Sequence, residues 1–202
     1  MLRNIRKEEL KEQIFLQSMA LFQEKGFDNV TVEEITRACG IAKGTFYNYF
    51  PKKEAILLHL GMLQMESAKE SLKRYDNLES LKEKLNFLFQ DLFARFSIYP
   101  DLARLTIAEM MRSSLLIKAE LSMIESFQSE LEVLIEEGKK KGQVVEQLTA
   151  SDVAAVVAGV YFYCLMVWAS SDMSADEMRA TFERRFEVVW GGICPKLDGE
   201  GE

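Results

Sequence analysis

Residues 40 to 50, GIAKGTFYNYF, combine a lysine, a threonine, an asparagine and four aromatic rings in eleven positions. If the segment is helical, each residue advances about 100°, and Phe46 points inward. The other face then carries Gly44, Thr45, Tyr47 and Asn48. Hydroxyls, an amide and a bare glycine backbone suit phosphate oxygens and base edges, whereas an ordinary surface helix carries Lys and Glu. The segment therefore indicates a surface that contacts nucleic acid.

Two short helices around a glycine turn are expected to hold this surface. Thr31 and Glu34 have the spacing of a capping box, which starts a helix, and Gly40 ends it. The next helix begins near Ala42, and Pro51 closes it within three turns. This order is the sequence form of a helix-turn-helix, in which the later helix reads DNA.

A longer helix from about Arg6 to Lys25 is predicted to support this pair, because its apolar residues recur at helical spacing. Gly26 ends it, and Phe27 is expected to fold back onto Phe22.

Charge is distributed unevenly along the chain. The net charge is −7, yet residues 1 to 60 hold nine Lys or Arg against eight Asp or Glu, and the remainder holds 16 against 24. An N-terminal segment without the acidic excess can dock a polyanion while the acidic remainder faces away.

Composition favours an all-α protein with a substantial core, since 48% of the 202 residues are hydrophobic and only three are proline. Three cysteines without CxxC spacing support neither a disulfide framework nor a structural zinc site. The single histidine, His59, excludes a multi-histidine metal site. GxSxG, HExxH and GxGxxG motifs are absent, so we expect no cofactor and no enzyme activity. The charged N-terminus lacks the apolar region of a signal peptide, and we expect a cytoplasmic protein.

The segment TVEEITRACGIAKGTFYNYFPKKEAIL resembles the DNA-binding segment of the TetR family of bacterial transcriptional regulators, and the resemblance covers roughly residues 8 to 58. It implies a homodimer with a helix-turn-helix domain over residues 1–52 and a larger effector-binding and dimerisation domain over residues 53–202. Thr31 and Lys53 resemble phosphate-contacting residues of the family. The residues that resemble its recognition helix are Lys43, Gly44, Thr45, Tyr47, Asn48 and Tyr49.

Glu33 departs from the family pattern, because it occupies a position in the second helix from which some family members contact a base. A carboxylate there repels phosphate or at most accepts a hydrogen bond from a cytosine amine. We therefore expect the second helix to contribute little to base recognition.

Six further helices are predicted from pattern alone. They run from about Lys53 to Arg74, from a cap at Asn77 to about Ile98, from Pro100 to about Arg112, from about Leu115 to Lys141, and from caps at Thr149 and Ser174.

Residues 153–169 contain no charged or amide side chain, which raises the alternative of a membrane span. At about 1.5 Å per residue they extend roughly 25 Å, short of a bilayer core of about 30 Å. A helix that is apolar all round is otherwise buried all round. The family resemblance accounts for the pattern by a four-helix dimer interface, here predicted to include Ala154, Ala158, Phe182, Phe186 and Val189.

The C-terminal part is rich in aromatic and methionine side chains, most of which are expected to be core. Together they are also suited to line an apolar effector pocket, although they do not identify the ligand. The predicted pocket residues are Phe89, Phe93, Phe96, Met110, Phe127, Tyr161 and Met166.

Together with these features, the resemblance to the TetR family implies a homodimeric repressor that binds a pseudo-palindromic operator in double-stranded DNA and is released by a small, apolar or aromatic effector. The effector would act through the fourth helix as a lever. A helical enzyme or ligand carrier that retains a helix-turn-helix is the main alternative, and a membrane-associated sensor is a more distant one.

Overall fold

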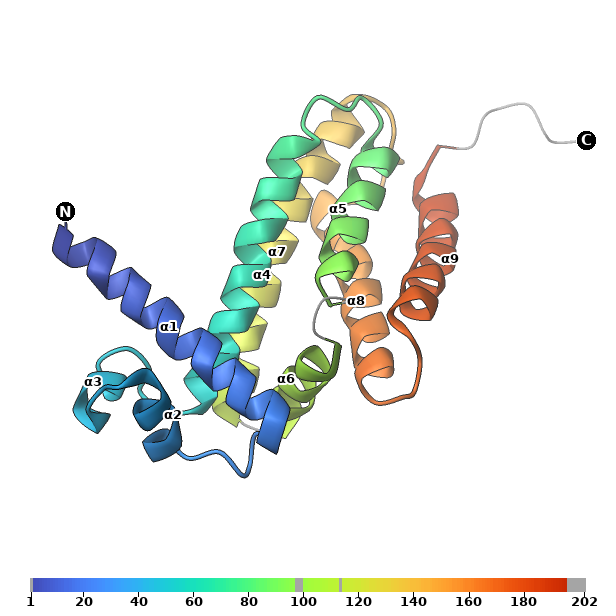
Figure 1. The fold of residues 1–202 in the computed structure, drawn as a ribbon. Coiled ribbons are helices and arrows are strands. Elements are labelled where there is room, and N and C mark those ends of the chain that lie inside the picture. Colours follow the sequence, from blue (N-terminus) through green and yellow to red (C-terminus); the bar gives the residue numbers. More distant parts are fainter. Residues whose placement is uncertain (1, 97–99, 113, 196–202) are drawn as a thin grey trace, which may run out of the picture.

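The computed structural model describes residues 2–96, 100–112 and 114–195. Within these ranges all regular structure is helical, which confirms the predicted class. A unit of three helices lies at one end of a larger helical bundle (Figure 1). The helices are α1 (Leu2–Lys25), α2 (Val32–Cys39), α3 (Lys43–Tyr47), α4 (Glu54–Arg74), α5 (Leu81–Phe96), α6 (Pro100–Arg112), α7 (Ser114–Lys140), α8 (Ala150–Ala169) and α9 (Ala175–Ile193).

Local signals set the ends of the first two helices as predicted. Gly26 follows α1 with a φ of 79°, and the Phe27 ring lies edge-on to Phe22 with 4.9 Å between centroids. At the start of α2, the Thr31 hydroxyl accepts a hydrogen bond from the Glu34 amide at 3.2 Å. The Glu34 carboxylate accepts one from the Thr31 amide at 2.9 Å, which completes the capping box.

The caps predicted for α8 and α9 are confirmed, and the cap predicted for α5 is wrong. Thr149 and Ser174 each accept a hydrogen bond from the third helical amide that follows. Asn77 does not cap α5, because the chain makes another turn there and the helix begins at Leu81. The predicted end of this helix at Ile98 lies outside the described residues.

Long-range contacts decide where α5 starts. The Ser80 hydroxyl accepts a hydrogen bond from the Glu83 amide at 3.3 Å. The side-chain oxygen of Gln143 accepts one from the Leu81 amide at 2.6 Å. Gln143 belongs to the connection between α7 and α8, so this start depends on a partner 62 residues away in the sequence.

Buried apolar side chains form two clusters. The N-terminal cluster joins α1, α2 and α3 with the start of α4, where Ile56 and Leu57 are fully buried. The C-terminal cluster extends from Ala68 of α4 to Ile193 of α9. The two ends of α4 thus belong to different clusters, and α4 connects them.

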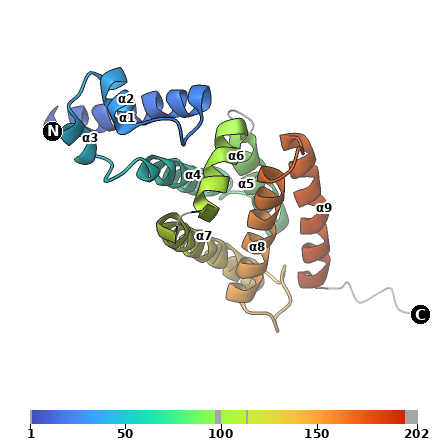
Figure 2. The same ribbon diagram turned by 90° about the horizontal axis from the view of Figure 1, so that it is seen from below.

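Helix α6 also connects the two clusters, and it lies beside α1 and α8 (Figure 2). Leu102 is buried in the N-terminal cluster, whereas the adjacent Ala103 is buried in the C-terminal one. Arg104 donates hydrogen bonds to one carbonyl near the end of α8 and to two carbonyls in the connection that follows. Its guanidinium carbon lies 4.5 Å from the Trp168 ring centroid. The accepting carbonyls belong to Trp168, Ser171 and Met173.

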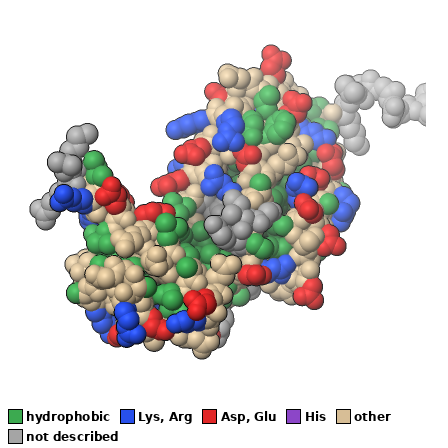
Figure 3. All heavy atoms as spheres, in the orientation of Figure 1, with side chains coloured by type: hydrophobic (Ala, Val, Ile, Leu, Met, Phe, Trp, Pro, Cys, Tyr) green, Lys and Arg blue, Asp and Glu red, His purple; other side chains and the backbone are tan. Residues whose placement is uncertain are grey.

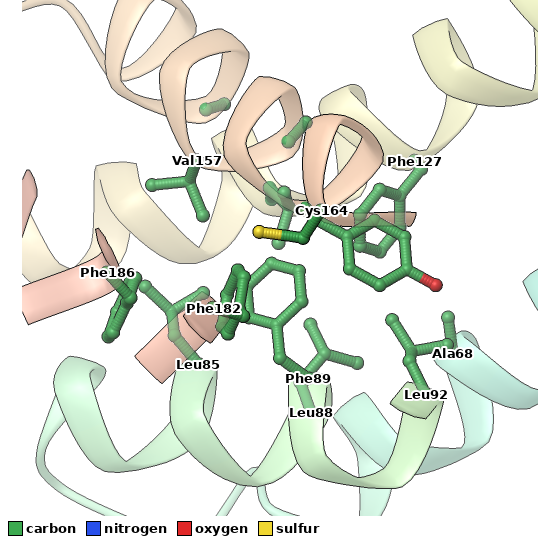
Figure 4. Packing of buried hydrophobic residues seen from close by; sticks show 14 of the residues in the cluster. Ala68, Leu85, Leu88, Phe89, Leu92, Phe127, Val157, Cys164, Phe182 and Phe186 are labelled. Carbon is green, nitrogen blue, oxygen red and sulfur yellow. The ribbon is translucent and has the colours of Figure 1, made fainter. Parts of the chain in front are cut away.

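Helix α8 satisfies the length and composition of a membrane span, but a core helix passes the same test. In this fold it packs against α7, α9 and α6. Figure 4 shows Val157 and Cys164 of α8 above Phe89 of α5, with Phe127 of α7 alongside. The buried residues of α8 are Ala150, Val153, Ala154, Val157, Ala158, Tyr161, Cys164, Leu165 and Trp168.

Candidate nucleic-acid interface

The aromatic residues that anchor α3 are buried as predicted. Phe46 is 0% exposed and Phe50 is 2% exposed. Their ring centroids lie 6.0 Å apart, and Phe50 also contacts the imidazole of His59 on α4. These contacts fix the face of α3 that is turned away from solvent, and hence the face that is presented to it.

The exposed face of α3 carries most of the predicted DNA-contacting residues. Lys43, Gly44 and Asn48 are exposed, and the Tyr47 side chain is 45% exposed. The helix spans only five residues, since Asn48 already forms its C-cap. Thr45 is half-buried.

Tyr49 departs from the prediction. It follows the end of α3 and is half-buried against the N-terminal cluster. The prediction treated residues up to Pro51 as one helix, whereas the earlier end of α3 turns this ring toward the core.

Lys53 is placed at the start of α4 as predicted, but its ammonium group has intramolecular partners. It donates hydrogen bonds to the backbone carbonyls of Phe27 and Val30, the latter at 2.9 Å. It also lies 4.1 Å from the Phe27 ring centroid. Lys53 therefore ties α4 to the α1–α2 connection, and its contact with the DNA backbone stays a prediction.

Two carboxylates in the first turn of α2 neutralise nearby lysines. Glu34 pairs with Lys25 at 2.9 Å, and Glu33 pairs with Lys43 of α3. Hydrogen bonds from the Thr31 backbone, then from Lys25, lower the pKa of Glu34 to about 2. The Thr31 hydroxyl is itself engaged in the capping box.

In the bundle, four predicted pocket residues pack directly on one another. Phe89, Phe93, Phe127 and Tyr161 are each at most 2% exposed. The Tyr161 centroid lies 5.3 Å from that of Phe89, 5.2 Å from Phe93 and 5.9 Å from Phe127. In the described part of the chain, a neighbouring cavity between α4 and α7 has a volume of about 10 Å³. A void of this size is at the lower limit for one water molecule.

The remaining pocket candidates have different environments. Phe96 is half-buried with its centroid 6.0 Å from Trp168. Met110 is half-buried near Gly61 of α4, where a methyl group on the glycine would lie 3.7 Å from its terminal carbon. Met166 is 43% exposed, and its part in a pocket stays a prediction.

Sequence reasoning missed Met123 of α7. A methyl group on Gly61 would lie 3.0 Å from the Met123 terminal carbon, so α4 and α7 approach closely there. A glycine inside a predicted helix was the available signal, since it often marks close packing.

Four of the predicted dimer-interface residues lie inside the protomer. Ala154, Ala158, Phe182 and Phe186 are at most 2% exposed, so their side chains cannot form a contact surface, and Val189 is half-buried. The apolar all-round sequence of α8 could not show which face the bundle covers.

The uncovered side of α8 is a stripe at helical spacing. Gly159 is exposed, and Val156, Tyr163 and Met166 are 51%, 54% and 43% exposed. On α9, Val188 is 78% exposed. We call these five residues the α8–α9 stripe.

Two protein-family models match this chain, one over the N-terminal unit and one over the C-terminal helices. Residues 14–60 match the family of bacterial regulatory proteins named tetR, and residues 59–189 match the C-terminal region of YsiA-like proteins. The chain belongs to the TetR family. This TetR-family regulator therefore carries a helix-turn-helix formed by α2 and α3, followed by a helical C-terminal domain.

Named relatives are transcriptional regulators. The uncharacterised HTH-type regulator YerO of Bacillus subtilis is 39% identical over 90 residues, which cover 41% of this chain and 31% of YerO. The fatty acid metabolism regulator protein of B. subtilis is 25% identical over 189 residues, covering 91% of this chain and 95% of the relative.

Solved structures share the fold over nearly the whole chain. FadR of Thermus thermophilus, in complex with lauroyl-CoA, has a TM-score of 0.75 at 22% identity and covers 95% of this chain and 100% of its own. FadR of B. subtilis, in complex with stearoyl-CoA, has a TM-score of 0.74 at 24% identity, with coverages of 90% and 98%.

Proposed function

We propose that this TetR-family regulator is a repressor that binds a pseudo-palindromic operator as a homodimer. The observation that carries the proposal is the exposed face of α3, where Lys43, Gly44, Tyr47 and Asn48 surround a helix held from behind by Phe46. A two-fold axis would have to set the two α3 helices about 34 to 36 Å apart, so that they enter successive major grooves.

The α8–α9 stripe is the surface we assign to the dimer contact. It is apolar, and the helices α8 and α9 that carry it lie on the side of the molecule away from α3 (Figures 1 and 2). Exposed glycines at 159, 191 and 192, with no atom within 4 Å of an added methyl group, would allow a partner helix to approach closely.

For the effector we propose a long-chain fatty acyl-CoA thioester. The support is the relative named for fatty acid metabolism, which aligns along 91% of this chain, together with the acyl-CoA complexes of structural neighbours. The aromatic and methionine lining of the bundle suits an alkyl chain. Because Phe89, Phe93, Phe127 and Tyr161 pack directly on one another, a chain that enters among them must displace rings.

The proposed coupling runs through α4. Its C-terminal end is held by Asp91 of α5, which accepts hydrogen bonds from Ser71 at 2.7 Å, Arg74 at 3.0 Å and Tyr75 at 3.1 Å. Its first residues are held to the helix-turn-helix by Lys53. An effector that parts α4 from α7 near Gly61 would favour a dimer whose α3 spacing no longer fits the operator, provided it binds that state more tightly.

DNA binding is tested with the purified protein and the DNA upstream of its own gene, by fluorescence anisotropy over a series of salt concentrations. We expect Tyr47→Ala to weaken binding at every salt concentration. Lys43→Ala should also reduce the slope of log affinity against log salt concentration by about one if Lys43 contacts a phosphate. Phe87→Ala, which removes a 40% exposed ring of α5 outside the α8–α9 stripe, controls for the general loss of a ring. Equal binding by wild type and Tyr47→Ala would refute the role of α3.

Effector action is tested by titrating lauroyl-CoA into the protein–DNA complex, with lauric acid and free CoA as controls. We expect lauroyl-CoA to release the DNA at concentrations where neither control does. Tight binding of lauroyl-CoA that leaves DNA affinity unchanged would contradict its role as effector. Release by lauric acid alone would place recognition in the alkyl chain rather than in the thioester.

A further inference from the structure

The ion pair between Lys43 and Glu33 joins the two helices of the helix-turn-helix. Lys43 is the first residue of α3, and Glu33 is the second residue of α2. Their side chains are 52% and 55% exposed, so both groups lie at the surface that faces DNA in the proposed function. The ammonium group nearest the exposed face of α3 is thus already bound to a carboxylate.

The local structure favours this carboxylate. Glu33 lies in the first turn of α2, where the helix dipole stabilises negative charge. The hydrogen bond from Lys43, followed by one from its own backbone amide, lowers the pKa of Glu33. The same bond raises the pKa of Lys43. Glu33 is not needed for the capping box, because that role belongs to Glu34.

Two further lysines of the N-terminal unit also have intramolecular partners. Lys25 pairs with Glu34, and Lys53 is held by two backbone carbonyls. Figure 3 shows basic and acidic side chains interleaved along the lower edge of the N-terminal unit. Attraction for phosphate is the main source of sequence-independent DNA affinity, and internal pairing weakens it.

A DNA phosphate that approaches Lys43 competes with Glu33 for the ammonium group, and the carboxylate remains close to the phosphate. Both effects oppose binding. They act whatever the base sequence is, because phosphates are the same at every step of the duplex.

We propose that Glu33 restrains the DNA affinity of this regulator by holding Lys43 in an intramolecular ion pair that competes with phosphate and places a carboxylate beside it. The residue thereby limits binding to arbitrary DNA and leaves recognition to the base-facing groups of α3. The inference rests on the proposed DNA-binding function and adds a residue that opposes it.

The test uses a short duplex of arbitrary sequence, because binding to it isolates the contribution of phosphates. Fluorescence anisotropy is measured over a series of salt concentrations for wild type, Glu33→Gln and Glu136→Gln. Glu136 is an exposed residue of α7, so its substitution makes the same change in net charge away from α3. We expect Glu33→Gln to bind about three- to ten-fold more tightly than Glu136→Gln, with a salt slope steeper by up to about one.

A double variant shows whether the effect acts through Lys43. If it does, Glu33→Gln should increase affinity in the Lys43→Ala background by no more than Glu136→Gln increases it in the wild type. Urea unfolding of each variant should remain close to wild type, since the capping box is intact.

The outcomes separate the inference from the proposed function. Salt-sensitive binding by wild type with equal affinities for Glu33→Gln and Glu136→Gln would overturn the inference alone. An undiminished gain in the Lys43→Ala background would overturn it too. Absence of salt-sensitive binding to any duplex in all variants would overturn the proposed function and the inference with it.

Discussion

At the scale of the residue, two glycines of the helix-turn-helix have opposite roles. Gly40 has a φ of 67° as the C-cap of α2, whereas Gly44 lies within α3. A methyl group at either position would meet no atom within 4 Å, so steric clash does not distinguish them. The difference between them is the backbone conformation alone.

We therefore predict that Gly40→Ala lowers the free energy of unfolding by about 1 kcal/mol, because an L-residue is strained in the left-handed region. Gly44→Ala should leave stability equal or slightly higher, since alanine favours helix, but should weaken DNA binding by placing a methyl group on the exposed face of α3. Urea unfolding and anisotropy of both variants make the comparison. A stability loss in Gly44→Ala as large as that in Gly40→Ala would contradict it.

The single residue His59 is expected to make the stability of the fold depend on pH. Its ring lies edge-on to Phe15 and to Phe50, with centroid distances of 5.1 Å and 5.8 Å. Burial, and then the charge of Lys11, lowers its pKa below the usual 6.5, while Glu12, Glu66 and Glu8 oppose the shift. The unfolded chain therefore binds a proton that the folded chain does not.

It follows that His59 contributes stability above pH 6.5 that is lost as the pH falls through its folded pKa. The measurement is the difference in unfolding free energy between wild type and His59→Gln from pH 8 to pH 5. We expect wild type to lose more stability than the variant as the pH falls. If the difference in unfolding free energy between wild type and His59→Gln stays constant with pH, burial does not lower the pKa of this imidazole.

At the scale of the element, α6 is held to the end of α8 by one side chain. Arg104 donates to three carbonyls that would otherwise lack intrahelical partners or lie in the turn. We predict that Arg104→Met costs about 2 kcal/mol of unfolding free energy. Arg104→Lys should retain only part of this stability, since one ammonium group cannot reproduce the planar set of donors of a guanidinium.

The control is Arg184→Met on α9, where the guanidinium is exposed and is bonded to the Thr181 hydroxyl at 3.1 Å. Urea unfolding of all three variants decides the point. If Arg104→Met is as stable as Arg184→Met, water satisfies the end of α8 equally well, and α6 owes its position to apolar packing.

At the scale of the whole molecule, the α8–α9 stripe should determine the oligomeric state. Val156→Lys introduces a charge on this stripe, and we expect it to convert the proposed dimer to monomers at micromolar concentration and to weaken DNA binding in parallel. Val133→Lys on α7 is the matched control, because Val133 is 61% exposed outside the stripe. Analytical ultracentrifugation provides the measurement. A dimer that survives Val156→Lys would place the interface elsewhere.

The sequence by itself determined what depends on neighbours in the chain. Helical class, the glycine stops, the capping boxes of α2 and α9 and the burial of Phe46 and Phe50 all follow from spacing within a few residues. The recognition of the family rests on the same local order of turn, cap and aromatic residues.

Only the tertiary structure decided what depends on residues far apart in the chain. Gln143 sets the start of α5, and the carbonyls of the α1–α2 connection engage Lys53. Helix α8 is apolar on every side, so its sequence cannot show that Ala154 is covered while Met166 is exposed. Likewise, the pairing of Lys43 with Glu33 depends on the packing of α2 against α3, which the spacing of the two residues in the sequence does not show.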